Sequence, residues 1–180
     1  MEARRLALFA AALSACAATG AAGPRGGESA ELSERETSAD HLLVVHYPRD
    51  FLKFFVGDNI HLAGPKGAAR LSDMFFHAEG RPISEDLNEL IRKDLVCSDS
   101  PPDTVTEKIQ RDASCFGGLP GLERSCLRTS TTDPTKQLFV WECVFVKNHH
   151  HFAFGYSVPT IVRAEVEPLL RRVLAAAEAN

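Results

Sequence analysis

The sequence lacks the marks of several common functional classes. Its 20 Lys and Arg residues are outnumbered by 24 Asp and Glu, for a net charge of −4, so it has no basic excess of the kind that binds nucleic acid. None of its five cysteines forms a C-x-x-C pair, which argues against a zinc ribbon or a thioredoxin-type site. Gly117-Gly118 lacks the strand-to-helix setting and the Lys of a phosphate-binding loop. No apolar run reaches membrane-spanning length.

The N-terminal segment has the layout of an export signal. Arg4 and Arg5 precede the apolar run 6–12, which is too short to span a bilayer. The run ends in Leu13-Ser14-Ala15-Cys16, which resembles the lipobox of bacterial lipoproteins. We therefore expect residues 1–15 to be a lipoprotein signal peptide and Cys16 to be lipidated. The alternative is an ordinary secretory signal that is cleaved a few residues later, with an incidental cysteine.

The segment after this signal is expected to be a spacer. Removal of residues 1–15 takes away Glu2, Arg4 and Arg5, which leaves 18 basic and 23 acidic residues and a net charge of about −5. Residues 16–40 are mostly small or polar and offer almost no large apolar side chain to a core. Such composition predicts a disordered tether, followed by a single domain over residues 41–178.

Cysteine usage agrees with export. Without Cys16 an even number remains, Cys97, Cys115, Cys126 and Cys143, which in an oxidising compartment predicts two disulfides. The predicted pairs are Cys126 with Cys143, on adjacent strands, and Cys97 with Cys115. This pairing places Arg128 opposite Trp141. The alternatives are other connectivities or buried free thiols.

The most informative stretch is residues 137–158, which predict two strands joined by a polar turn at 147–150. The first strand, 138–146, is apolar on both faces except at Glu142, which is typical of a strand in the middle of a covered sheet. Further strands are expected at 42–47, 54–56, 60–62, 69–78 and 122–131, with a weak edge strand at 105–110.

Two helices complete the predicted fold. Residues 84–96 place apolar side chains at helical spacing after a candidate N-cap, Ser84. A second helix is expected to begin near Glu167, with Pro168 in its first turn. The predicted fold class is α+β, an antiparallel sheet of about six strands packed against two helices.

The order of these elements resembles the PsbP-like superfamily, which includes small bacterial lipoproteins of the LpqN kind. The resemblance covers residues 41–178 and rests on Tyr47-Pro48-Arg49-Asp50-Phe51 after the first strand, on the Gly-Leu-Pro-Gly run at 118–121, and on Pro168 in the terminal helix. It implies a PsbP-like sandwich that serves in assembly, stability or interaction. The superfamily has no shared catalytic motif, so no functional residue is carried over.

Two polar features are candidate sites. His149-His150-His151 offers metal-ligand side chains, but consecutive residues of a strand point to opposite faces, which favours a solvated turn. Glu142 interrupts an apolar strand and as a buried carboxylate could act as a general acid or base. The alternative is a salt bridge or contact with solvent. No catalytic residue, cofactor or metal is predicted.

The leading hypothesis is therefore a non-catalytic lipoprotein of the bacterial cell envelope. We expect it to face the periplasm, to be anchored through Cys16 in a membrane such as the outer membrane, and to bind an envelope protein or another envelope partner. It would be secreted if Cys16 is not lipidated. The alternative is a periplasmic protein that binds a small ligand or a metal. An enzyme is not expected.

Overall fold

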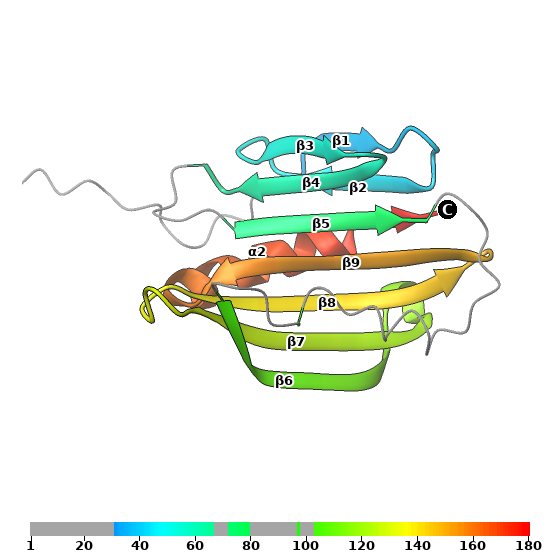
Figure 1. Ribbon diagram of the computed structural model, residues 1–180. Helices are drawn as coiled ribbons and strands as arrows, with labels where there is room; N and C mark the ends of the chain where they lie inside the picture. The colour runs from blue at the N-terminus through cyan, green and yellow to red at the C-terminus, as the bar shows by residue number, and fades with distance from the viewer. Residues whose placement is uncertain (1–30, 67–71, 80–96, 98–102) are drawn as a thin grey trace, which may run out of the picture.

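The computed structural model describes residues 31–66, 72–79, 97 and 103–180. These residues form two antiparallel sheets and one α-helix (Figure 1). The larger sheet has seven strands in the order β3-β4-β5-β9-β8-β7-β6, and the smaller has three in the order β1-β2-β10. The elements are β1 Glu34–Thr37, β2 Leu43–Tyr47, β3 Leu52–Val56, β4 Asn59–Gly64, β5 Ser72–Ala78, β6 Asp103–Ser114, β7 Pro120–Ser130, β8 Gln137–Lys147, β9 His150–Pro159, β10 Glu178–Ala179, the helix α2 Arg163–Ala175, and the 3-10 turns η1 Phe116–Gly118 and η2 Thr160–Val162.

The expected fold of about six strands against two helices is wrong. The described residues contain a second sheet, and a single α-helix lies against the strands. The sequence did not predict the strands β1 and β10 because they are short and have no alternation of apolar and polar residues. Both are stabilised by antiparallel pairing with β2. The helix expected at 84–96 lies outside the described residues.

Strand structure begins earlier than the expected domain boundary at residue 41. The strand β1 falls within the range 16–40 that was expected to be a tether, and it pairs along its length with β2. The sequence pattern did not predict β1 because its side chains are polar. An edge strand of a small sheet depends on backbone hydrogen bonds to its neighbour more than on apolar side chains. Residues 16–30, with Cys16, lie outside the described residues.

The core lies between the larger sheet and a second layer made of the smaller sheet and α2. Both of these cover the same face, and α2 crosses behind β9 in Figure 1. Buried side chains from all three parts meet there: Leu43 and Val45 from β2, Met74, Phe76 and Tyr156 from the larger sheet, and Val166, Leu170 and Val173 from α2. The second layer covers only part of this face, so the larger sheet is left uncovered beside α2.

The strand β8 lies inside the sheet, as its two-sided apolar pattern predicts. It pairs with β7 on one side and with β9 on the other. Val144 and Phe145 point to opposite faces and are both fully buried. The turn to β9 is made by Asn148 and His149, both at positive φ (50° and 64°), which suits the two-residue turns of β-hairpins.

The helix α2 begins at Arg163 rather than near Glu167. The turn η2 leads directly into it, so Pro168 lies within the helix and not in its first turn. Pro168 removes one backbone donor, but Val166, Leu170, Val173 and Leu174 are buried against the sheet and stabilise the helix. Within the described residues, no helix has the length and apolar character needed to cross a membrane.

The strand β3 forms one edge of the larger sheet and is apolar on its exposed surface. Leu52, Phe54, Phe55 and Val56 are each between 42 % and 54 % exposed. Lys53, in the middle of the strand, pairs with Glu36 and lies 5.5 Å from the centroid of the Phe55 ring. An exposed apolar edge strand is prone to pair with another chain.

Candidate functional site

A groove lies beside α2, where the larger sheet extends past the helix. It consists of two depressions of about 310 Å³ and 300 Å³ that share Glu123, Trp141 and Arg171. The first is closed on its other side by η1 and the end of α2, and the second by β6 and Arg163. We call this surface the Trp141 groove.

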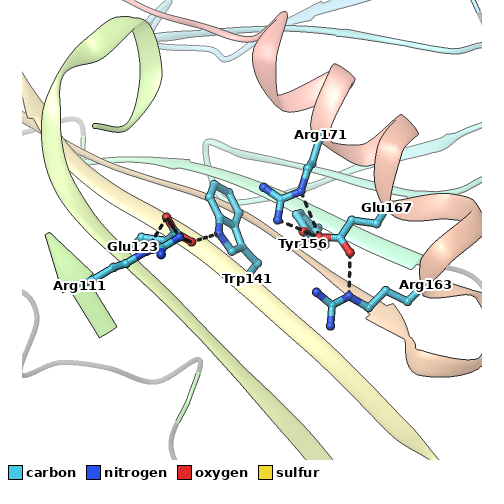
Figure 2. A network of polar contacts seen from close by, with 7 residues as sticks. All are labelled: Arg111, Glu123, Trp141, Tyr156, Arg163, Glu167 and Arg171. Atoms are coloured by element: carbon cyan, nitrogen blue, oxygen red, sulfur yellow. Dashed lines mark hydrogen bonds and ion pairs between the residues drawn. The ribbon is translucent and has the colours of Figure 1, made fainter. Parts of the chain in front are cut away.

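Trp141 is the centre of the groove. It lies on β8, and its indole Nε1 donates a hydrogen bond of 2.9 Å to Oε1 of Glu123 on β7. The indole ring stacks on the buried ring of Tyr156 at 5.6 Å and 22°. The Arg171 guanidinium lies 5.2 Å from the Trp141 ring centroid, within the range of a cation–π interaction. Strand and helix thus hold the indole from three sides (Figure 2).

Glu123 joins Trp141 to the sheet edge. Besides the indole, it accepts hydrogen bonds from Arg111 on β6, with Nη2 at 3.0 Å and Nε at 3.3 Å. Burial alone would raise the pKa of Glu123, but the hydrogen bonds from Trp141 and Arg111 outweigh it and lower that pKa. Glu123 is therefore ionised at neutral pH.

Glu167 organises the helix side of the groove. It accepts hydrogen bonds from Arg163 Nε at 2.7 Å, from Arg171 Nη2 at 2.8 Å and from the Tyr156 hydroxyl at 2.5 Å (Figure 2). Burial opposes ionisation, but these three donors prevail and lower the pKa of Glu167 to about 2. Burial and the bond to Glu167 raise the pKa of Tyr156 far above its usual value. The hydroxyl therefore stays protonated.

This arrangement is suited to recognition and poorly suited to proton transfer. General acid–base catalysis needs a group that titrates near the working pH, whereas Glu123 and Glu167 are held ionised and Tyr156 is held neutral. The two cysteines beside the groove, Cys115 and Cys143, are bonded to each other, so neither is a nucleophile. What remains is a shallow aromatic surface bordered by fixed charges.

Glu142 lies on the opposite face of the sheet from the Trp141 groove. It pairs with Arg124, directly across on β7, and both side chains are almost fully buried. The salt-bridge alternative is thus the correct one for Glu142.

The expected disulfide pairing is wrong. Cys97 bonds Cys126, with Cα atoms 5.9 Å apart, and Cys115 bonds Cys143 at 6.1 Å. The reason is the register of β7 and β8, in which Cys126 lies opposite Val140 and Cys143 opposite Glu123. Cys126 and Cys143 therefore point to opposite faces of the sheet.

The same register removes the expected contact between Arg128 and Trp141. Arg128 lies opposite Leu138, and Trp141 lies opposite Ser125. Arg171, from the distant helix, takes the position over the indole instead.

The three consecutive histidines do not converge. His149 lies in the turn, His150 contacts the Glu79 carbonyl oxygen with Nδ1 at 2.9 Å, and His151 follows on β9. Residues 150 and 151 alternate faces as strand geometry requires.

Sequence reasoning missed most of the residues of the groove. Glu123 and Trp141 lie far from the helix residues in the chain, and only the spacing of Arg163, Glu167 and Arg171 at i, i+4 was a local signal. That signal indicates ion pairs along a helix. It does not indicate that the pairs border an aromatic surface.

Comparisons with solved structures identify the fold. The chain is similar to cyanobacterial PsbP (CyanoP) from Synechocystis, with a TM-score of 0.55 and 14 % identity over 88 % of this chain and 100 % of that one. A Bacteroides thetaiotaomicron protein has a TM-score of 0.55 at 13 % identity, over 83 % of this chain; the match spans about half (49 %) of that protein. The Saccharomyces cerevisiae Ran-binding protein Mog1p has a TM-score of 0.53 at 10 % identity, over 81 % and 94 % of the two chains.

These similarities support a PsbP-like fold, as the order of elements predicted. At such low identity they establish the fold alone. No protein-family profile and no curated protein sequence matches the chain.

Proposed function

We propose that this chain is a non-catalytic lipoprotein of the bacterial cell envelope that binds a protein partner through the Trp141 groove. In this proposal residues 1–15 are a signal peptide. Lipidated Cys16 anchors the domain to a membrane, and the domain faces the periplasm. The proposal includes kinship with lipoproteins of the LpqN kind. If Cys16 is not lipidated, the same domain acts as a secreted protein.

The observation that carries the proposal is the composition and shape of the groove. Trp, Tyr and Arg are the residues most enriched where protein interfaces concentrate their binding energy, and here Trp141, Arg163 and Arg171 line one surface, with the buried ring of Tyr156 stacked against the indole. The Arg163 guanidinium carbon lies 3.3 Å from the centroid of the Phe139 ring, which adds a second cation–π platform. The side chains are held by hydrogen bonds before any partner arrives, which lowers the entropic cost of binding.

One of the named structural neighbours is called a Ran-binding protein. A fold can support unrelated functions, so the groove rather than the neighbours carries the proposal.

A test follows from the fact that Trp141 is the only tryptophan of the chain, so its fluorescence reports on the groove alone. Proteins that copurify with the membrane-anchored protein in mild detergent are titrated against the purified protein, and a true partner shifts Trp141 emission. Arg171→Met keeps the aliphatic stem over the indole but removes the charge. We expect it to weaken binding about tenfold, or about 1.4 kcal/mol.

The matched control is Ile161→Ala, at a side chain that is 79 % exposed and does not line the groove. It should bind as the wild type does. A partner that binds without changing Trp141 fluorescence, or that binds Arg171→Met at full strength, would place recognition elsewhere on the molecule.

A small ligand is the second candidate, favoured by the depression of about 310 Å³ between η1 and α2. This volume is at the lower end of ligand-binding cavities. Quenching of Trp141 by a small envelope metabolite, in a protein with no protein partner, would favour this alternative.

A further inference from the structure

The two disulfide bonds of the domain differ in their access to solvent. Cys97 and Cys126 are both buried, at 2 % and 1 % exposure. In the other bond Cys143 is 2 % exposed, whereas Cys115 is partly exposed. Exposed disulfides are the ones that exchange with external thiols, and buried cysteines are inert. The bond between Cys115 and Cys143 is therefore the one that is open to thiol chemistry.

This accessible bond lies in the wall of the Trp141 groove. Cys115 and Cys143 both line the first depression, of about 310 Å³, as Trp141 does. Cys143 lies two residues after Trp141 on β8, so both side chains point to the same face of the sheet. A partner that fills this depression contacts the disulfide.

The turn η1 has an anchor in the core that does not depend on the disulfide. Cys115 directly precedes this turn. The ring of Phe116, within the turn, stacks on Phe145 at 5.7 Å and 16°, and meets the Phe154 ring edge to face at 4.6 Å. Both of these partners are fully buried. Opening of the disulfide should therefore leave the domain folded.

We propose that the bond between Cys115 and Cys143 is a thiol–disulfide exchange site, and that it reacts with a protein dithiol that docks in the Trp141 groove. The proposal rests on the Trp141 groove as the docking surface and adds a chemical step that binding alone does not need. The chain is the substrate of this reaction, and the dithiol is the reductant.

The reaction transfers two electrons in two steps. A thiolate of the dithiol attacks Sγ of Cys115, the exposed end of the bond, and forms a mixed disulfide with it. Cys143 leaves as a thiolate and takes up a proton from water. The second thiolate of the partner then attacks its own sulfur in the mixed disulfide and releases Cys115, which is protonated in turn. The partner leaves as a disulfide, and this chain keeps two thiols.

The test uses the purified protein and a thioredoxin-type protein dithiol as the probe. Free thiols are trapped with iodoacetamide at successive times, and the labelled peptides are mapped. We expect label on Cys115 and Cys143 roughly tenfold sooner than on Cys97 and Cys126. Equal rates, or earlier opening of the buried bond, would overturn the proposal.

A second measurement identifies the sulfur that is attacked and needs no variant of this chain. A probe whose second thiol is replaced by Ser cannot complete the reaction. It should stay joined to the peptide that contains Cys115. A probe joined to the peptide of Cys143 instead would contradict the proposed attack.

Two variants test whether the dithiol docks in the groove. Ala175 is exposed and lines the first depression, so Ala175→Phe should fill it and slow opening of the bond by the probe about tenfold, equal to about 1.4 kcal/mol. Ala164 is an exposed residue of the same helix that lines neither depression. Ala164→Phe, the matched control, should react as the wild type does. A wild-type rate in Ala175→Phe would overturn docking in the groove.

These outcomes are distinct from those that test the proposed function. A partner that binds the groove while both disulfides resist the probe would refute the exchange site alone. Selective opening of the bond in a protein whose Trp141 emission responds to no partner would refute the proposed function and leave the exchange chemistry standing.

Discussion

Arg124 and Glu142 lie directly opposite each other on β7 and β8 and form an ion pair whose side chains are only 5 % and 2 % exposed. The buried residues Cys126, Val140 and Val144 lie on the same face of the sheet as the pair. Removing one partner of a buried pair leaves a charge in a medium that solvates it poorly.

We therefore expect Glu142→Gln to lower the free energy of unfolding by about 3 kcal/mol. The double variant Arg124→Met with Glu142→Leu should be much closer to the wild type, because it leaves no charge behind. Urea unfolding, monitored by Trp141 fluorescence, measures the free energy of unfolding of both variants. Glu165→Gln, on the exposed face of α2, is the control. A single variant as stable as the double one would mean that the pair contributes little.

Acid should weaken the helix side of the Trp141 groove. The folded-state pKa of Glu167 is about 2, below the usual 4.5, so its contribution is complete above pH 4.5 and is lost as the pH falls toward 2. Because solvent screens the partly exposed arginines, we expect ionised Glu167 to contribute roughly 1 kcal/mol to the free energy of unfolding. In Glu167→Gln the loss of stability between pH 5 and pH 3 should be smaller than in the wild type, whereas Glu165→Gln should follow the wild-type profile.

Protonation of His77 should cause a second loss of stability at milder acidity. Its folded-state pKa of about 4 lies below the usual 6.5, so the folded protein binds fewer protons than the unfolded chain. The contribution is complete above pH 6.5 and is lost as the pH falls toward 4. We expect about 1 to 2 kcal/mol between pH 7 and pH 5, measured by urea unfolding. The His77→Gln variant should show a flatter profile over this window, and an unchanged slope would contradict the assignment.

Peptide mapping without reduction should find Cys97 joined to Cys126 and Cys115 joined to Cys143. The residues of each pair are 29 and 28 positions apart, so each bond should stabilise the fold by roughly 3 to 4 kcal/mol. Replacing both cysteines of one pair by alanine should lower the free energy of unfolding by about that amount. A peptide that joins Cys126 to Cys143 would contradict the register of β7 and β8.

Lys53 should limit self-association through the edge strand β3. A charge in the middle of an apolar edge opposes pairing with a second chain. Lys53→Ala is expected to increase the weight-average mass in sedimentation experiments as the concentration rises, and Val56→Lys to decrease it. Ile161→Lys, at an exposed apolar residue outside β3, serves as the control. Equal effects of Val56→Lys and Ile161→Lys would show that the edge has no special role.

The sequence by itself determined the features that depend on neighbouring residues. The two-sided apolar pattern of β8 requires cover on both faces, the polar segment 147–150 requires a turn, and Gly57 at a φ of 63° allows the tight turn between β3 and β4. The resemblance to a PsbP-like fold, which the solved structures support, likewise rested on short local features such as the turn after Tyr47 and the Gly-Leu-Pro-Gly run at 118–121.

The tertiary structure decided everything that depends on register and on distant contacts. A change of register by one residue moves every side chain of a strand to the other face, and the pattern of β8, apolar on both faces, does not select one register. The disulfide pairs therefore followed from the pairing of Cys126 with Val140. The start of α2, the second sheet and the meeting of Trp141 with Arg171 likewise depend on burial against segments far away in the chain, which no local pattern encodes.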